Sequence, residues 1–144
     1  MVVVPARASR AARDQLVDDL VRKVRNRRPM LSASDKELTL RARQLADAYI
    51  PQAQPSSVRW VGNQHHQWGS CTPLTGEIRI SERLRPVPAW VLDGVLVHEL
   101  AHLIEPTHSA TFRALVGLYP RAKEVDAFLA GLALGLDLVV DGVQ

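Results

Sequence analysis

The sequence predicts a single α+β domain in which helices pack on a small antiparallel sheet. At 144 residues the chain is long enough for one domain with a hydrophobic core and too short for two. Apolar residues recur at helical spacing on both sides of the middle of the chain, whereas in the middle the period changes and Glu77–Ile80 alternates between polar and apolar. We therefore expect one domain over 1–144, with a helical N-terminal region over about 1–50 and a core over about 56–135.

Two helices are expected in the N-terminal region. The first should run from about Ser9 to Arg25, where apolar side chains form one stripe and charged side chains the opposite face. The second should begin after Ser34, because Ser34-Asp35-Lys36-Glu37 has the form of a capping box, and should run to about Tyr49, before Pro51. The expected buried face of this second helix consists of Leu38, Ala42, Leu45 and Tyr49.

The middle of the chain is expected to form a small antiparallel sheet of two or three strands. Val58–Val61 and Glu77–Ile80 have strand character, and Gln64–Cys71 is a candidate for the strand between them. Thr72–Gly76 has the composition of a turn, which would join the last two strands as neighbours.

The second half of the chain is expected to be mostly helical. Pro88 suits the first turn of a long apolar helix, and Ser109 can cap a further helix that Pro120 ends. A last helix should run over Arg121–Leu134. We expect Asp137–Gln144 to form a short strand or a frayed end.

The long apolar helix contains the sequence His98-Glu99-Leu100-Ala101-His102, an H-E-x-x-H motif. Side chains four apart lie on one helix face, so both imidazoles should point toward a common centre. Two imidazoles this close repel each other when protonated, whereas a divalent metal such as zinc satisfies both. Glu99 lies one step round the helix, where its carboxylate can take a proton from a metal-activated water. An ordinary pair of helix histidines is the alternative interpretation.

A catalytic zinc site needs a third protein ligand and a fourth position for water. His108 is the first candidate, because Pro106 cannot continue the helix and the chain should turn back toward the metal. Glu105, Glu124 and Asp126 are alternative third ligands. No methionine follows the motif, which excludes the Met-turn of the metzincins.

Composition restricts the cellular setting. With 47% hydrophobic and 23% charged residues, the chain has an ordinary globular composition. Cys71 is the only cysteine, which excludes an internal disulfide and fits a reducing cytoplasm. The apolar stretches at the two ends are too short for a signal peptide or a membrane span. We expect a cytoplasmic monomer without a membrane partner.

The net charge of +3 is distributed unevenly. Residues 1–30 contain eight basic side chains and three acidic ones. Such a segment could make weak contact with nucleic-acid phosphates. A solvated helix face is the favoured interpretation, because no aromatic residue that could stack on bases lies there.

From about Val58 to Leu129 the chain resembles the YgjP-like metallopeptidase-domain proteins. The features that carry the resemblance are Trp68-Gly69-Ser70-Cys71, Ile78-Arg79-Ile80 before Leu84, the H-E-x-x-H motif, and His108-Ser109 with Phe112. The resemblance implies a zincin-like fold with a backing helix, a small twisted sheet, an active-site helix and a helix after the third ligand. It also implies that His98, His102 and His108 are metal ligands and that Glu99 is the catalytic glutamate.

The favoured function is that of a zinc-dependent hydrolase of peptide bonds, a metallopeptidase acting on a peptide or protein. Zinc would polarise the scissile carbonyl and lower the pKa of its bound water to about 7. Glu99 would take the proton of that water and pass it to the leaving amine. A peptide could add to an edge strand of the sheet, for which we expect Glu77–Ser81. The carboxylate of Glu105 or Asp93 is expected to accept a hydrogen bond from a ligand histidine.

Two other functions are considered. A metal-dependent hydrolase of nucleotide phosphoanhydrides could use Arg59, Arg79 and Arg83, although the sequence has no glycine-rich phosphate loop. A DNA-associated module with a structural metal is the third. A structural zinc normally has four protein ligands, whereas this motif offers three histidines and a glutamate suited to catalysis.

Overall fold

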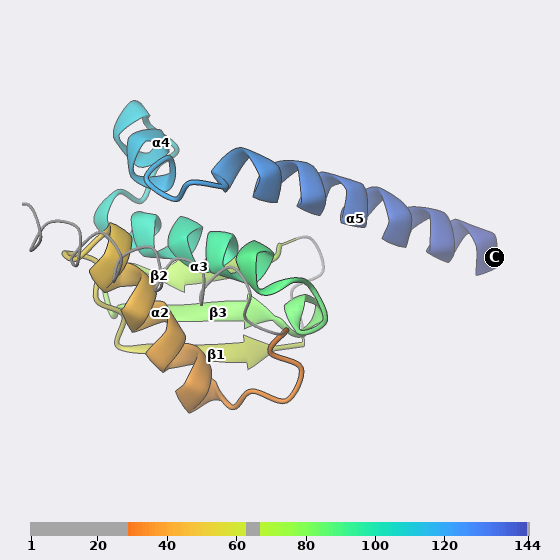
Figure 1. Cartoon of the computed structure of the whole chain (residues 1–144), viewed down its shortest axis with the longest axis horizontal. Coiled ribbons are helices and arrows are strands. Elements are labelled where there is room, and N and C mark those ends of the chain that lie inside the picture. Colours follow the sequence, from red (N-terminus) through yellow and green to blue (C-terminus); the bar gives the residue numbers. More distant parts are fainter. Residues whose placement is uncertain (1–28, 63–66, 144) are drawn as a thin grey trace, which may run out of the picture.

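A computed structural model describes residues 29–62 and 67–143 of the chain, with side chains up to residue 135. The predicted α+β class is confirmed. The helix expected from Ser9 to Arg25 and nearly all of the basic segment lie outside the described residues. In chain order the elements are α2 (Asp35–Tyr49), β1 (Ser57–Val61), β2 (Gly69–Thr72), β3 (Glu77–Ser81), the short 3-10 helix η1 (Glu82–Leu84), α3 (Ala89–Ile104), α4 (Ala110–Val116) and α5 (Ala122–Val143) (Figure 1).

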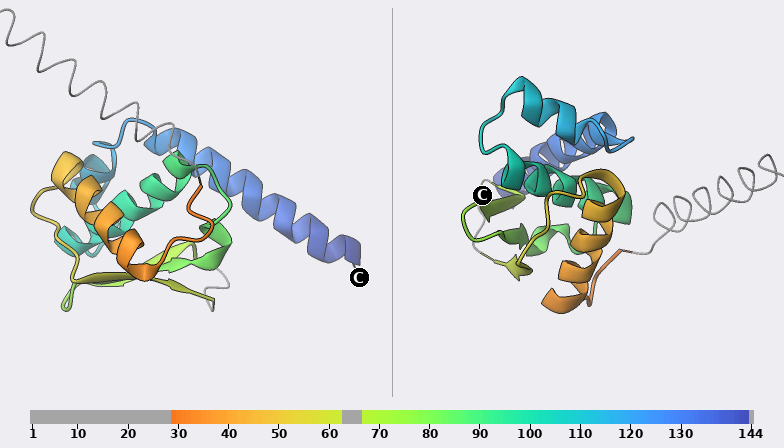
Figure 2. Two further views of the ribbon diagram at one scale, coloured as in Figure 1. Left: turned by 60° about the horizontal axis from the view of Figure 1, so that its bottom comes forward. Right: turned by 90° about the vertical axis from the view of Figure 1, so that its left-hand side faces the viewer.

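Helix α3 lies at the centre of the fold. It contacts β2 and β3 on one side, α2 on another, and α4 and α5 on the side away from the sheet (Figure 2). Its sequence is apolar almost all round, which is the pattern of a helix buried on most of its surface. Leu92, Leu96 and Leu100 are no more than 1% exposed. The division into a region over about 1–50 and a core over about 56–135 stays a prediction, and α2 packs directly on β1 and α3.

Helix α2 begins where the capping box predicts. The Ser34 hydroxyl accepts a hydrogen bond from the Glu37 N–H at 3.1 Å, and the Glu37 carboxylate accepts one from the Ser34 N–H at 3.2 Å. These two contacts satisfy amide groups that the first helical turn leaves without partners. The predicted buried face is confirmed for Leu38, Ala42 and Leu45, each no more than 2% exposed.

The sheet is mixed, so the prediction of an antiparallel sheet was only half correct. The strand order is β1-β3-β2; β2 pairs antiparallel with β3, as the turn at Thr72–Gly76 predicts, but β1 pairs parallel with β3. Alternating polarity shows which face of a strand is buried and does not show its direction. Residues 62–76 are long enough to carry the chain back to the start of the sheet, as parallel pairing requires. The expectation that Glu77–Ser81 is an edge strand was wrong, because β3 is central.

Side chains of α2 cover the outer edge of β1. The Val58 N–H donates to the Thr39 hydroxyl at 2.9 Å, and the Trp60 N–H donates to the Asp35 carboxylate at 2.9 Å. Both amides point away from β3, where an added strand would otherwise bind. Among the described residues, the outer edge of β2 is therefore the side of the sheet that another strand can reach.

Helix α5 is longer than the sequence predicted. It continues to Val143, so the expected end at Leu134 and the expected strand or frayed end over Asp137–Gln144 were wrong as far as the structure is described. Gly131 and Gly135 each cost about 1 kcal/mol relative to alanine in a helix, but Leu132, Ala133 and Leu134 between them favour helix. No helix in the described part of the chain is long and apolar enough to cross a membrane.

A buried ion pair joins α2 to α3. Arg41 Nε donates to Asp93 Oδ1 at 2.9 Å, a second hydrogen bond joins Nη2 to Oδ2, and the two side chains are 4% and 1% exposed. We expect Arg41→Ala to lower the free energy of unfolding by about 3–5 kcal/mol, because it leaves the Asp93 charge buried without its cation. Urea unfolding measures this change.

The matched control is the exposed pair between Arg121 and Glu124, whose side chains are 28% and 59% exposed. Glu124→Gln should cost no more than about 1 kcal/mol, because water screens an exposed pair. If Arg41→Ala unfolded at the same urea concentration as the unmodified protein, the buried pair would contribute nothing net to stability.

Candidate metal centre

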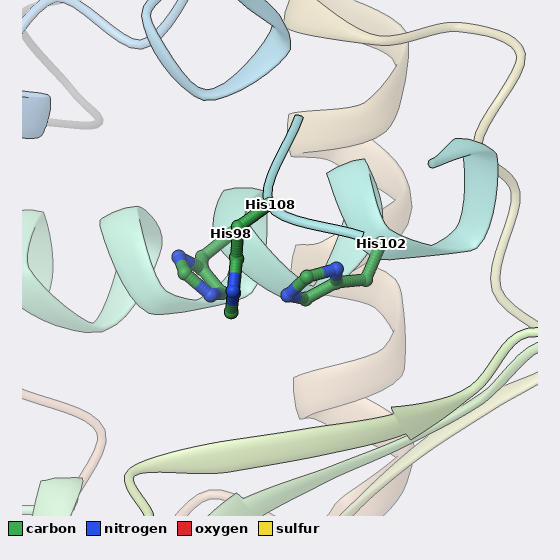
Figure 3. A group of neighbouring side chains, drawn as sticks. All are labelled: His98, His102 and His108. Atoms are coloured by element: carbon green, nitrogen blue, oxygen red, sulfur yellow. The ribbon is translucent and has the colours of Figure 1, made fainter. Parts of the chain in front are cut away.

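Three histidines meet at the C-terminal half of α3. His98 and His102 project from successive turns of α3, and His108 reaches the same place from the loop after the helix (Figure 3). One ring nitrogen from each lies within 4.8 Å of the other two. Two nitrogens bound to one zinc at about 2.0–2.1 Å are at most about 4 Å apart, so small ring movements would let all three share an ion. The structure thus brings together the three histidines that the sequence proposed.

The loop that carries His108 is fixed at both ends. Helix α3 ends at Ile104, and α4 begins after Ser109, whose hydroxyl accepts from the Phe112 N–H at 3.2 Å. Arg113 donates to the backbone oxygen of His108 at 3.0 Å. The turn expected at Pro106 is confirmed, and it places His108 beside His102 with ring centroids 4.8 Å apart.

A backbone carbonyl orients His102. Its Nδ1 lies 3.2 Å from the backbone oxygen of Glu105, a contact that requires the proton on Nδ1 and leaves the lone pair on Nε2 for a metal. The carboxylates of Glu105 and Asp93, which were expected to accept a hydrogen bond from a ligand histidine, have other partners. The Glu105 carboxylate accepts from the Thr107 hydroxyl at 2.8 Å, and Asp93 pairs with Arg41.

Phe112 packs against all three imidazoles. Its ring stacks on His102 with centroids 4.2 Å apart and meets His98 and His108 edge-on at 4.9 and 5.0 Å. Phe112 is 4% exposed, so it closes one side of the cluster to water. Phe112 is part of the family resemblance in the sequence, but its position in the sequence carried no information about these contacts between elements.

The electrostatics of the cluster suit a cation with neutral imidazole ligands. Burial, with smaller effects of His102 and His108, lowers the pKa of His98 to about 4. Burial also lowers the pKa of His102. These imidazoles therefore stay neutral and keep a lone pair for a metal at neutral pH. A donor set of three imidazoles fits zinc, which commonly takes three protein ligands when the fourth position serves catalysis.

Glu99 lies in the same cavity as the three histidines and is only 5% exposed. Burial raises the pKa of its carboxyl to about 7, although the charge of Arg79 and a hydrogen bond from Cys71 oppose the shift. A carboxyl whose pKa lies near the pH of its surroundings can both take up and release a proton.

Strand β2 approaches Glu99 closely. A Cβ atom at Gly69 would lie 3.2 Å from both Glu99 Cγ and the backbone oxygen of Arg79, so the glycine lets the glutamate lie against the strand. The Cys71 thiol hydrogen-bonds to Glu99, and burial raises the pKa of that thiol to about 11, which keeps it protonated as a donor. Cys71 is not in the histidine group.

The cavity around these residues has a volume of about 630 Å³. Of the alternative third ligands, Asp126 lines the cavity but is not in the histidine group, and Glu124 is bound to Arg121 at 2.6 Å. The residues that line the cavity come from the β2 segment, α3, the His108 loop and the α4–α5 region.

The arginines considered for phosphate binding do not line this cavity. Arg79 donates to the hydroxyls of Ser70 and Thr72, each at 3.0 Å. Arg83 lies over the ring of Trp68, 4.7 Å from its centroid. Arg79 thus joins β3 to β2, and Arg83 packs on Trp68 at the cavity. Because these guanidinium groups do not line the cavity, they do not support a phosphate site at the histidine cluster.

Comparison with known proteins agrees with this geometry. The model of the YgjP-like metallopeptidase domain matches residues 4–131, a longer stretch than the resemblance expected from the sequence. The crystal structure of the metallopeptidase zymogen of Pyrococcus abyssi abylysin is similar, with a TM-score of 0.53 and 25% identity over 68% of this chain and 94% of that chain. No curated protein matches the sequence. The expected zincin-like α+β fold is confirmed, and the chain belongs to the YgjP-like metallopeptidase-domain family.

Proposed function

We propose that the protein is a zinc-dependent peptidase in which His98, His102 and His108 hold the metal and Glu99 is the general base. The observation that carries the proposal is the convergence of three imidazoles with a buried carboxyl in one cavity. A bound zinc ion supplies Lewis acidity toward the scissile carbonyl and makes a water molecule easier to deprotonate.

Glu99 handles the protons of the reaction. Its carboxylate takes a proton from the attacking water and delivers it to the nitrogen of the leaving amine, so that no net proton remains on the enzyme. Burial of Glu99 raises the pKa of its carboxyl in the metal-free site, which favours the uptake of a proton by this side chain. The Cys71 thiol and the close approach of Gly69 restrict where the carboxyl can lie.

The substrate would bind along β2. The segment from Gln67 to Cys71 lines the cavity opposite α3, and β2 is the sheet edge on that side. A peptide cannot add to β1, because side chains of α2 occupy its outer edge. It cannot add to β3 either, because β3 is the central strand. An extended peptide could add to β2 through backbone hydrogen bonds and cross the histidine cluster.

The other two functions have less support. A nucleotide phosphoanhydride would need cations in the cavity, and Arg59, Arg79 and Arg83 are not among its lining residues. A structural metal would normally have a fourth protein ligand, and the group found in the described part of the chain has three. Nucleic-acid contact through the basic segment, the monomeric state and the cytoplasmic location stay predictions.

Metal removal and replacement test the proposal. After stripping with a chelator, the full chain should not cleave an unfolded protein such as casein, and one equivalent of zinc should restore cleavage, because the imidazoles need the ion to activate water. Magnesium is the matched control and should not restore cleavage, since it prefers oxygen ligands. Undiminished cleavage by the stripped protein, or failure to bind zinc, would contradict the proposal.

A further inference from the structure

The cavity at the histidine cluster has two unlike walls. The wall on the β2 side is mixed, with the polar side chains of Gln67 and Ser70 beside Trp68, Gly69, Cys71 and Pro73, and Glu99 and the three histidines also line the cavity. The opposite wall, from the end of α4 and the start of α5, is apolar and is formed mainly by Val116, Tyr119, Val125 and Leu129. We call this surface the α4–α5 wall.

The α4–α5 wall lies beside the position expected for the reaction. Gly94 and Val95, which meet it on α3, precede His98 by about one helical turn, or about 5.4 Å along the axis. Neighbouring residues of an extended peptide are about 3.3 Å apart. A peptide with its scissile bond at the histidines would therefore place the side chain of an adjacent residue against this wall.

Close packing of α5 on α3 sets the depth of the wall. A Cβ atom at Gly94 would lie 2.4 Å from Val125 Cγ2, so α5 can approach this closely only because residue 94 is glycine. Val95 and Val125 are each 4% exposed and form an apolar base. Val116 and Leu129 are partly exposed and form its sides.

The wall offers few polar groups to a substrate. The Tyr119 hydroxyl donates to the backbone oxygen of Trp90 at 2.7 Å, so this contact already uses its proton. Asp126 is exposed at the rim and is the charged side chain that α4 and α5 contribute to the cavity lining. An acidic substrate side chain would lose hydration against the valines and leucine and be repelled by Asp126.

We propose that the α4–α5 wall is a substrate subsite that accepts an apolar side chain, such as that of leucine, methionine or phenylalanine, next to the scissile bond and rejects an acidic one. The subsite rests on the proposed peptidase function, because the histidine site must fix the position of the scissile bond. Burial of an apolar side chain there should favour leucine over aspartate by about 10- to 100-fold in kcat/KM.

Cleavage of a mixed peptide library by the zinc-loaded full chain, read by mass spectrometry, tests the subsite. The unmodified protein should prefer apolar residues beside the cleaved bond, and Leu129→Glu should shift that preference toward lysine and arginine. Leu134→Glu is the matched control, since Leu134 lies on the same helix, is 62% exposed and does not line the cavity. Its cleavage profile should match that of the unmodified protein.

A binding measurement separates the subsite from the chemistry. Calorimetry with the zinc-loaded protein would compare hydroxamates that carry an isobutyl or a carboxymethyl side chain, and the isobutyl compound should bind at least about 10-fold more tightly. Tighter isobutyl binding without peptide cleavage would support the subsite and contradict the peptidase proposal. Peptide cleavage without apolar preference, or equal binding of both hydroxamates, would overturn the subsite alone.

A second variant guards against misfolding of Leu129→Glu. Val116→Phe keeps the wall apolar and narrows it, so the preferred substrate residue should change from phenylalanine or leucine to valine or alanine. An unchanged size preference in Val116→Phe would overturn the placement of the subsite at this wall.

Discussion

Glu99→Gln should keep one zinc ion per chain and lower kcat by about 10²- to 10⁴-fold, the contribution typical of a positioned general base. Glutamine has nearly the shape of glutamate but cannot take a proton, so the substitution removes the base and leaves the packing against Gly69 in place. Glu99 is not in the histidine group, and the ion should therefore stay bound. Metal analysis and the rate of peptide cleavage, measured on one preparation, check both halves of the expectation.

Glu124→Gln is the matched control for this prediction. It makes the same chemical change at a carboxylate that pairs with Arg121 and does not line the cavity. Its kcat should stay within a few-fold of the unmodified value, as expected for a surface substitution away from the site. Loss of zinc from Glu99→Gln would make Glu99 a ligand, and full activity would place the general base elsewhere.

His108→Ala should weaken zinc binding by more than about 100-fold. Loss of a residue that only supports a ligand costs about 10- to 100-fold in affinity, and removal of a direct ligand should cost more. His108 is exposed and lies on a loop, so its removal should leave the metal-free fold intact. Competition with a coloured chelator measures the affinity, and urea unfolding of the metal-free protein measures the fold.

Two further variants decide between the candidate third ligands. Glu105→Ala and Asp126→Ala should keep the zinc affinity of the unmodified protein within about 10-fold, since neither side chain is in the histidine group. If His108→Ala bound zinc normally and one of these variants did not, the third ligand would be that carboxylate and the proposed centre would be wrong.

The parts of the fold that depend on neighbours in sequence could be predicted. Ser34 and Glu37 are three residues apart, and their capping box fixes the start of α2. His98 and His102 share a face by helix geometry alone, and Pro106 with Ser109 predicts the turn that returns His108. Each of these features comes from backbone geometry within one or two turns of chain.

Features that depend on packing between distant segments could not be predicted. The direction of β1, the position of β3 at the centre of the sheet and the burial of Asp93 by Arg41, 52 residues away, have no local signal. The contacts of Phe112 with three imidazoles and of Gly69 with Glu99 arise only when α4 and β2 pack on α3. Hydrophobic periodicity shows that a residue is buried without showing what covers it.

The cover that Asp35 and Thr39 place over β1 has a consequence for self-association. A sheet can continue through many copies of a protein only if each copy has two exposed edge strands, one that pairs with the preceding copy and one that pairs with the next. In the described part of the chain, α2 covers one of the two sheet edges, so pairing through β2 would stop after two copies and would also bury the cavity at the histidine cluster. The same two side chains that hold α2 to the sheet thus act as a barrier to open-ended fibre formation.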